Sequence, residues 1–302
     1  MSEFSDMIRK AFGDSDRKRD VGLKTPKNII RFDNISYGPH TVWNLLDVYR
    51  PKKVSGKLPV IAVIHGGAWV YGDKDVYQFY GMSLAGRGFA VVNFSYRLAP
   101  EYKYPAQLED ICLAFKFIYS HADAYGFDLD NIFAVGDSAG ALLLTSFSDL
   151  VTNPDCRKDF KAQFPKAKLS LPKGIHLNAV ALNCGKYDLG KDMDQDSNAK
   201  AVIRELLPKK GTKKEMELVS GDRYVNPKFP PAFVMTCPGD FIKDQAKYIV
   251  EALTANGVPF CYRYYGSDKD PLHHVFHCNV RLPEAKKCND DECKFFKEYI
   301  SH

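Results

Sequence analysis

Hydrophobic and polar positions follow two alternating patterns along most of the chain. Largely apolar runs at 59–64, 89–96 and 131–135 predict buried strands. Between these runs, apolar positions recur every three or four residues, as in the stretch that opens at Pro105, and predict helices. Because strands that alternate with helices imply crossover connections, we expect an α/β fold with a mostly parallel sheet. Further strands are expected at 175–184, 232–237 and 258–265, and further helices at 76–84, 242–255 and 290–300.

The N-terminal part of the chain follows a different pattern. Apolar residues at helical spacing between positions 4 and 12 predict a short amphipathic helix, with a frayed terminus as the alternative. Two strands are expected at 29–37 and 43–49, because turn-forming residues at Gly38-Pro39 separate two apolar-rich runs. These two strands would add an antiparallel entry to the parallel sheet.

A long interval without a strand pattern lies between Cys184 and Ala232. It contains more than forty residues and two helix-like segments. An interval of this length in a compact domain is usually functional or inserted. We therefore expect one domain over 1–302, carrying a small helical cap built from segments at about 1–25 and 186–228.

Composition and charge exclude several classes of partner. The chain has 302 residues, of which 45% are hydrophobic and 26% charged, as is ordinary for a globular protein. Its net charge of +5 is modest and the lysines are spread out, so we expect no nucleic-acid partner. The densest basic stretch, 157–173, is interpreted as a solvated loop or helix face. We expect no membrane partner and no secretory signal, because no apolar stretch is long enough to span a bilayer and the first residues lack a basic, then apolar, pattern.

Eight cysteines bear on the cellular compartment and on metal binding. Several lie within predicted strands or helices, where a thiol behaves as a small hydrophobic group. A reduced, cytoplasmic location fits this pattern best. Cys278, Cys288 and Cys293 follow closely after His277, which is a reason to consider zinc, but the chain has no Cys-x-x-Cys pair. We therefore expect no metal site.

The segment 136–140 has the pattern Gly-x-Ser-x-Gly between a strand-like run and a helix-favouring run. At a sharp strand-to-helix turn, Ser138 would point its hydroxyl out above the sheet, and the flanking glycines would let the backbone crowd there. The helix that follows would present free N–H groups, including that of Ala139, toward developing negative charge. Ser138 is therefore the candidate nucleophile for acyl transfer.

Acyl transfer also needs a base and a group that orients the base. Both should follow strands, because the carboxyl ends of parallel strands meet at one edge of the sheet. Asp240 follows the next-to-last predicted strand and is the candidate acid. Asp244 is the competing candidate, but it falls in the first turn of the next predicted helix, where the helix dipole stabilises a carboxylate. Three candidates for the base, His273, His274 and His277, follow the last strand.

The loop 65–69 has the sequence His-Gly-Gly-Ala-Trp and follows the predicted strand at 59–64. Glycines in such a loop let backbone N–H groups approach a ligand closely. Donors from this loop, together with the N–H of Ala139, would hold the anion that develops on an attacked carbonyl oxygen.

Three motifs in combination resemble the hormone-sensitive-lipase-like branch of the α/β-hydrolase carboxylesterases. The resemblance extends from about Asp47 to the end of the chain. It implies a serine esterase in which Ser138 is the nucleophile, Asp240 the acid and a late histidine the base, and this order of the three residues is the one found in the fold. It also implies a cap formed by the N-terminal segment and the inserted stretch. The motifs are the loop 65–69, the segment Tyr-Arg-Leu-Ala-Pro-Glu at 96–101 with Pro105-Ala106 and Asp110, and the serine motif at 136–140.

The oxyanion motif departs from that family at one position. Ala68 stands where a third glycine is usual, and its N–H remains a donor unless the backbone needs a positive φ. By position in the motif, Gly67 and Ala68 would donate together with Ala139, while Gly66 supplies the turn. These four residues make up the predicted oxyanion hole.

The segment around the base departs from the family as well. The family's catalytic histidine is commonly followed by Gly-Phe, and the closest match here is His274-Val275-Phe276. His274 is therefore the expected base, and His273, one position earlier, is the alternative.

These residues predict a serine carboxylic ester hydrolase that acts through an acyl-enzyme intermediate, with no metal or organic cofactor. The modest cap favours short acyl chains, with an acetyl ester as one option. Trp69 is a candidate for shaping the substrate pocket, with core packing as its alternative role. A serine peptidase of the same fold and a non-catalytic, hydrolase-like binding protein are the alternative functions. A small-molecule ester is the expected partner, and no oligomeric state is predicted.

Overall fold

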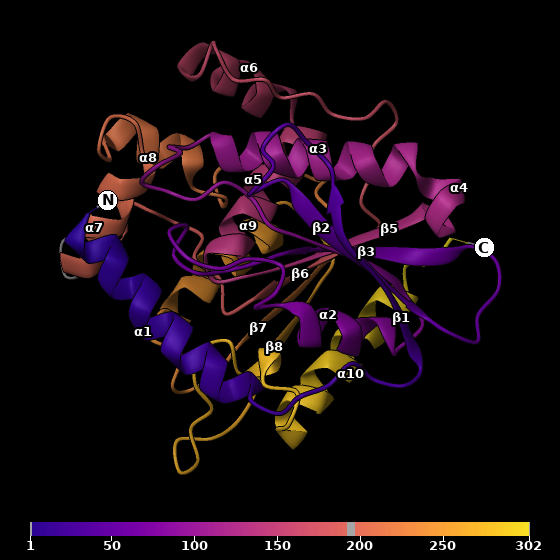
Figure 1. Cartoon of the computed structure of the whole chain (residues 1–302). Helices are drawn as coiled ribbons and strands as arrows, with labels where there is room; N and C mark the ends of the chain where they lie inside the picture. The colour runs from indigo at the N-terminus through magenta and orange to yellow at the C-terminus, as the bar shows by residue number, and fades with distance from the viewer. Residues whose placement is uncertain (1, 192–196, 302) are drawn as a thin grey trace.

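A computed structural model describes residues 2–191 and 197–301 of the chain. In these residues an eight-stranded sheet runs through the molecule in the order β1-β2-β4-β3-β5-β6-β7-β8 (Figure 1). β2 pairs antiparallel with β1 and β4, and all the other pairs are parallel. The predicted α/β fold with a mostly parallel sheet is therefore confirmed. The strands are β1 (Ile29–Ser36), β2 (Leu45–Pro51), β3 (Leu58–Ile64), β4 (Ala90–Phe94), β5 (Phe127–Asp137), β6 (Ala179–Asn183), β7 (Ala232–Thr236) and β8 (Phe260–Tyr264).

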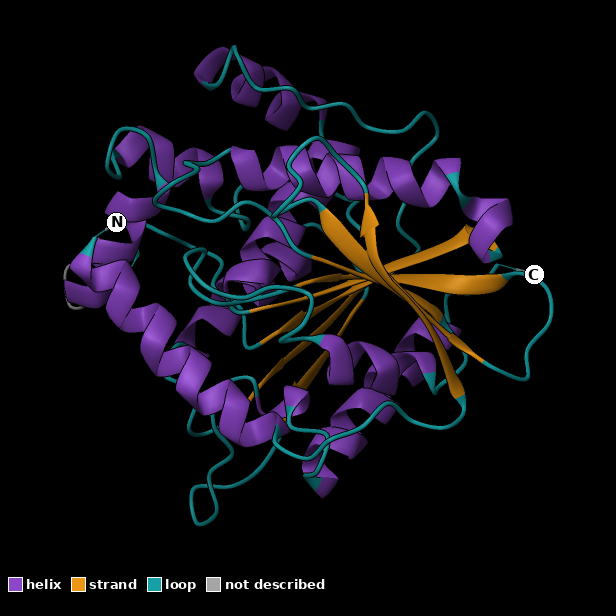
Figure 2. Cartoon of the chain, viewed as in Figure 1, coloured by secondary structure: helices purple, strands orange, loops and turns teal. Residues whose placement is uncertain are grey.

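Helices cover both faces of the sheet (Figure 2). Side chains of α3, α5 and α9 pack on one face, and those of α2 and α10 pack on the other. The α-helices are α1 (Glu3–Asp20), α2 (Gln78–Ala85), α3 (Ala106–Ser120), α4 (Ala122–Tyr125), α5 (Ala139–Thr152), α6 (Pro154–Gln163), α7 (Ser197–Leu206), α8 (Lys213–Val219), α9 (Ala246–Ala255) and α10 (Pro283–Lys297), and short 3₁₀ turns lie at η1 (Lys243–Gln245) and η2 (Phe276–Cys278).

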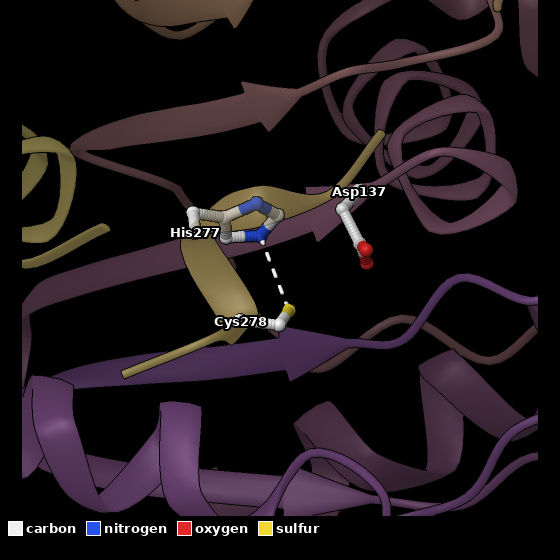
Figure 3. A group of neighbouring side chains, drawn as sticks. All are labelled: Asp137, His277 and Cys278. Carbon is white, nitrogen blue, oxygen red and sulfur yellow. Dashed lines mark hydrogen bonds between the residues drawn. The ribbon is translucent and has the colours of Figure 1, made fainter. Parts of the chain in front are cut away.

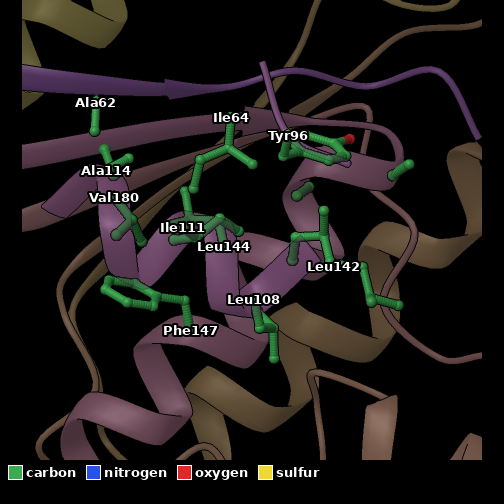
Figure 4. Close-up of a cluster of buried hydrophobic side chains, with 14 of the residues drawn as sticks. Ala62, Ile64, Tyr96, Leu108, Ile111, Ala114, Leu142, Leu144, Phe147 and Val180 are labelled. Atoms are coloured by element: carbon green, nitrogen blue, oxygen red, sulfur yellow. The ribbon is translucent and has the colours of Figure 1, made fainter. Parts of the chain in front are cut away.

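Alternation along the central strand β3 explains why the fold has two cores. Val60, Ala62 and Ile64 belong to the cluster that contacts α3 and α5, whereas Ile61 and Val63 belong to the cluster that contacts α2 and α10. Successive side chains of a strand point to opposite faces, so a strand buried on both faces has an apolar residue at nearly every position. Figure 4 shows part of the first cluster, where side chains of β3, α3 and α5 pack together.

Two helices, α10 and α1, differ from the sequence-based expectations, whereas α6 agrees with the interpretation of its basic residues as part of a solvated loop or helix face. α10 begins at Pro283 rather than near 290, because proline fits the first helical position, where no N–H partner is needed. Part of the basic stretch 157–173 belongs to α6, whose start is capped by the Asn153 side chain. The N-terminal helix has 18 residues rather than being short, and the Ser2 hydroxyl caps it by accepting from the N–H of Ser5.

The predicted cap segments 1–25 and 186–228 contain α1, α7 and α8, while residues 1 and 192–196 lie outside the described residues. α1 and α7 contact each other beyond the carboxyl ends of the strands (Figure 1). Of the helices in the described residues, none combines the length and the apolar character needed to cross a membrane.

Candidate active site

Ser138 lies at the sharp turn between β5 and α5. Its backbone has φ +51° and ψ −117°, a region that non-glycine residues rarely occupy and that is typical of strained functional positions. The turn is tight on both sides: a Cβ added to Gly136 would lie 2.5 Å from the carbonyl oxygen of Gly140, and one added to Gly140 would lie 2.1 Å from that of Ile64. Both glycines are therefore required for the backbone to pass, as the motif predicted. The Ser138 N–H donates to the carbonyl of Asn183 at 3.0 Å.

His274 lies between Ser138 and Asp240. Its Nε2 is 3.0 Å from the Ser138 hydroxyl oxygen, and its Nδ1 is 2.7 Å from Oδ1 of Asp240. The carboxylate also accepts from the Thr236 hydroxyl at 2.7 Å and from the N–H of Ile242 at 3.0 Å. Burial alone would raise the pKa of Asp240, but the hydrogen bond and charge of His274, with these two further donors, outweigh it and lower the pKa below 3.8. Asp240 is therefore held as a carboxylate that can orient the imidazole.

The competing residues have other surroundings. His273 lies in the backbone bridge that pairs its segment with Gly239, and its carbonyl accepts from the N–H of Phe276. Asp244 is exposed and lies in η1. His277 is fully buried in η2, which precedes α10 in the chain. The structure therefore brings together Ser138, His274 and Asp240 from the larger set of candidates.

The loop 65–69 faces the serine turn. The N–H of Gly66 donates to the Tyr77 hydroxyl at 2.9 Å, which leaves Gly66 to shape the turn. Within the described residues, no group accepts a hydrogen bond from the N–H of Gly67, Ala68 or Ala139. These three donors are therefore available for a ligand.

Both positions at which the chain departs from the family motifs have positive φ. Ala68 has φ +52°, and Val275, directly after His274, has φ +53°. Side chains with a Cβ pay about 1–2 kcal/mol per residue in this conformation, and a β-branched residue is a clear outlier there. Glycine at either position would avoid this cost, which explains the family's preference in physical terms. A positive φ was the condition under which Ala68 was expected to cease to be a donor, and that condition is met. Its N–H nevertheless has no acceptor within the described residues, so the positive φ by itself does not remove the donor.

Trp69 contributes to both the pocket and the packing. Its side chain is only 4% exposed, and its indole N–H donates to the Ala139 carbonyl at 3.1 Å. It also lines the cavity that contains Ser138. Trp69 therefore ties the loop 65–69 to the serine turn as well as forming part of the cavity wall.

A cavity of about 580 Å³ opens above Ser138 and His274. Its walls come from α1, α7, the loop 65–72 and the segment around Phe241. Most of the wall is apolar, which is typical of sites for small organic ligands. The side chains that α1 and α7 contribute include Phe4, Met7, Ile8, Ala11, Phe12, Ala199, Val202 and Ile203.

Polar contacts hold α1 over this cavity. Arg9 forms a paired hydrogen bond with Glu101, at 2.9 and 2.7 Å, and also donates to the carbonyls of Val70 and Ala99. Farther along the helix, Asp16 accepts from the Tyr71 hydroxyl at 2.9 Å. These contacts leave no signal in the sequence, because a single arginine on an amphipathic helix carries no pattern that distinguishes a structural link from a solvated charge.

Asp137, which directly precedes Ser138, lies together with His277 and Cys278 (Figure 3). Asp137 comes from the end of β5, and the other two come from η2; their ligand-type atoms lie within 4.8 Å of one another. These three side chains could therefore hold a metal ion. The set differs from the one considered for zinc in the sequence, which combined His277 with Cys278, Cys288 and Cys293. The Asp137 carboxylate already accepts from the Tyr77 hydroxyl at 2.6 Å. Burial raises the pKa of Asp137 from 3.8 to about 6, against the opposing hydrogen bond from Tyr77 and the charge of His274.

Glu292 on α10 is a second buried carboxyl group near the serine turn. It is fully buried and accepts from the Asn183 side chain at 2.7 Å and from the Tyr80 hydroxyl at 2.9 Å. Burial raises the pKa of Glu292 from 4.5 to about 7, although both hydrogen bonds act in the opposite direction.

This pKa shift predicts a pH-dependent stability. Because the folded-state pKa of Glu292 lies above the unfolded value of about 4.5, the native state holds the proton more tightly. The contribution of Glu292 to stability is then complete below about pH 4.5 and is lost as the pH rises through about 7, a change of about 3 kcal/mol. In Glu292→Gln this group cannot titrate. Urea unfolding should therefore show that the stability of wild type relative to the variant falls by about 3 kcal/mol between about pH 4.5 and 8.

The matched control for this prediction is Glu284→Gln, on the exposed side of the same helix. It also replaces a glutamate of α10 by glutamine, but the carboxylate that it removes is exposed. A difference between wild type and Glu292→Gln that stays constant over the pH range would contradict the prediction.

Comparisons with known proteins agree on one class. A family model described as BD-FAE matches residues 46–248. The chain is 28% identical to versiconal hemiacetal acetate esterase of Dothistroma septosporum over 249 residues, covering 79% of this chain and 73% of that protein. It is 29% identical to carboxylesterase NlhH of Mycobacterium tuberculosis, covering 78% of this chain and 74% of the relative. Its fold is similar to that of esterase B from Lactobacillus rhamnosis, with a TM-score of 0.86 and 22% identity over 99% of this chain and 97% of the other.

Proposed function

Because the chain belongs to the BD-FAE family and is a carboxylic ester hydrolase with the α/β-hydrolase fold, we propose that Ser138, His274 and Asp240 are its catalytic triad. The observation that carries this proposal is the continuous chain of hydrogen bonds from Asp240 through His274 to the Ser138 hydroxyl. The nucleophile, the base and the orienting acid each follow a different strand of one sheet in the polypeptide. This is the arrangement that acyl transfer requires.

The geometry supports the following reaction. His274 Nε2 takes the proton of the Ser138 hydroxyl as the serine oxygen attacks the ester carbonyl, and Asp240 stabilises the imidazolium that forms. His274 then gives the proton to the leaving alcohol, which leaves an acyl group on Ser138. Water attacks this acyl-enzyme with His274 again acting as base, and the carboxylic acid is released.

Backbone N–H groups of Gly67, Ala68 and Ala139 would bind the negative oxygen of each tetrahedral intermediate. This role is supported because, among the described residues, no group accepts a hydrogen bond from these three N–H groups, whereas the N–H of Gly66 already donates to the Tyr77 hydroxyl. Ala139 also opens α5, so the partial positive charge of the helix N-terminus is directed at the same point.

We further propose that α1, together with the segment 186–228, acts as the cap of a single catalytic domain. The support is that α1 and α7 supply apolar side chains to the wall of the cavity above Ser138. The cavity of about 580 Å³ must hold both the acyl and the alcohol part of an ester, which favours small substrates with short acyl chains. One relative is named as an acetate esterase, which supports an acetyl ester as one option.

A chain-length series of p-nitrophenyl esters tests this preference. Because apolar side chains of α1 and α7 form part of the cavity wall and limit its volume to about 580 Å³, kcat/KM should be highest for acyl chains of two to six carbons. It should fall at least about tenfold by twelve carbons, the size of change expected when a ligand no longer fits its pocket. Met7→Ala removes a side chain from the wall and so enlarges the cavity, which should shift the optimum toward longer acyl chains. Met82→Ala removes a methionine from the core on the face of the sheet that α2 and α10 cover, and it should leave the optimum unchanged. An optimum at ten or more carbons in the wild type would contradict the proposal.

The proposed partner is a small-molecule ester, with no nucleic acid and no membrane surface. A cytoplasmic location is proposed as well, and it is supported by the eight cysteines, all of which are free thiols.

A further inference from the structure

The two sides of the proposed oxyanion hole come from different strands. Gly67 and Ala68 follow β3, and Ala139 follows β5. β3 and β5 pair in parallel up to Ile64 and Gly136, where the ladder of backbone hydrogen bonds ends. The sheet therefore sets the spacing of the strands but not that of the donor groups beyond them.

Tyr77 bridges these two segments. Its hydroxyl oxygen accepts from the N–H of Gly66 at 2.9 Å and donates its proton to Oδ2 of Asp137 at 2.6 Å. Gly66 directly precedes the donor Gly67, and Asp137 directly precedes Ser138. A single hydroxyl group thus joins the residue before one set of donors to the residue before the nucleophile.

The bridge is buried and tightly packed. Tyr77 is 7% exposed and Asp137 is 2% exposed. A Cβ added to Gly66 would lie 3.0 Å from the Tyr77 hydroxyl oxygen and 3.0 Å from the Asp137 carbonyl oxygen. Removing the hydroxyl would take away the acceptor of the Gly66 N–H at 2.9 Å and the donor to the Asp137 carboxyl at 2.6 Å, and would leave each of these two buried groups with the other as a partner. A buried group that stays unsatisfied costs about 1–3 kcal/mol. The loop would therefore move toward other partners rather than stay in place.

A second contact holds the other end of the same loop. The Trp69 indole N–H donates to the carbonyl of Ala139 at 3.1 Å. Gly67 and Ala68 therefore lie between two points, Gly66 and Trp69, that are each tied to the serine turn. Loss of the Tyr77 hydroxyl would remove the contact at Gly66 and leave the hydrogen bond of Trp69 in place.

We propose that Tyr77 is a positioning residue for the oxyanion hole: through Asp137 and Gly66 it sets where the N–H groups of Gly67 and Ala68 lie relative to Ser138. This inference rests on the proposed function of Ser138 and of those donors. Tyr77 also lines the cavity, but its hydroxyl is already engaged by Gly66 and Asp137, so we assign its effect to the backbone of the loop 65–69.

Tyr77→Phe tests the proposal because it removes only the hydroxyl. Loss of one oxyanion donor costs about 10²- to 10³-fold in kcat, so displaced donors should cost about 10- to 100-fold, with KM for an aryl acetate changed less than about threefold. The inhibition constant of a trifluoromethyl ketone, whose adduct with serine carries an oxyanion, should rise by the same factor as kcat/KM falls. A purely structural role for Tyr77 would not make these two quantities change in parallel.

Tyr49→Phe is the matched control. Tyr49 is also fully buried, and its hydroxyl also donates to a buried carboxylate, that of Asp47, at 2.9 Å, but on β2 and away from the cavity wall. It should lower the melting temperature by an amount similar to Tyr77→Phe while leaving kcat within about twofold, since it has no contact with the donors. If both variants lose kcat equally, or if Tyr77→Phe changes KM alone, the proposal is wrong.

Asp137→Ala tests the same bridge from its other end and carries the test if Tyr77→Phe does not fold. It should lower kcat by a similar factor, and the double variant should be no worse than the poorer single variant, because both remove one link. Additive losses would overturn the proposal. Failure of the proposed function is separate: in that case Ser138→Ala would keep its activity, whereas failure of this inference leaves Ser138→Ala inactive and Tyr77→Phe unimpaired.

Discussion

Ser138→Ala should lower kcat for an aryl acetate about 10⁶-fold, the loss measured when a triad nucleophile is removed from a serine hydrolase. The size follows from the geometry at the turn, where Nε2 of His274 lies 3.0 Å from the Ser138 hydroxyl oxygen, its one hydrogen-bond partner within residues 2–191 and 197–301. Alanine has one atom fewer and should keep the strained backbone of the turn, so the melting temperature should change little. Initial rates with p-nitrophenyl acetate, down to the uncatalysed background, measure the effect.

A fluorophosphonate probe gives the same prediction a second readout. The wild type should gain the mass of one phosphonyl group in intact-mass analysis, and Ser138→Ala should gain none. Ser120→Ala, which changes an exposed serine at the end of α3, is the matched control and should be labelled like the wild type. Near-normal turnover by Ser138→Ala would rule out the proposed nucleophile, and labelling elsewhere would identify another.

Asp240→Asn should lower kcat about 10⁴-fold, as the corresponding change does in another serine hydrolase. The Asp240 carboxylate accepts from Nδ1 of His274 at 2.7 Å, which leaves Nε2 free to take the serine proton. An amide at this position can donate to Nδ1 instead and so stabilise the wrong tautomer of the imidazole. KM should change far less than kcat, because Asp240 does not line the substrate cavity. Steady-state kinetics at a fixed pH separates the two constants.

Asp244→Asn is the control for this change. Asp244 is four positions from Asp240 but is exposed in η1, and it should leave kcat within about twofold, as is usual for surface substitutions. A larger loss in Asp244→Asn than in Asp240→Asn would transfer the role of the acid to Asp244.

Much of the fold could be predicted because it depends on burial and local turns. β3 was recognisable because residues on both of its faces are buried, so nearly every position is apolar. The serine turn was recognisable because its glycines are required by local sterics: a side chain on Gly136 would collide with the carbonyl of Gly140, four positions away. The start of α10 at Pro283 and that of α6 after Asn153 were missed, although the capping residues that set them are local too.

Other features of the site depend on segments that are far apart in the chain. His274 meets Ser138 across 136 positions, and Tyr77 meets Asp137 across 60. Between strands the chain has no repeating period, so the direction of a loop side chain follows from its backbone, as at Val275 with φ +53°.

The succession of strands and helices along the chain and the strand-to-helix turn at Ser138 therefore follow from apolar periodicity and local sterics, and the candidate groups follow from residue type and from their place after predicted strands. All of these can be recognised in the amino-acid order. His274 was expected over His273 only from the likeness of its segment to a family motif. The contact of His274 with Ser138, the link from Arg9 to Glu101 that holds α1, and the Tyr77 bridge do not follow from the amino-acid order. Each of these depends on the positions of atoms brought together by folding, because a hydrogen bond forms only within a few tenths of an ångström of its preferred length.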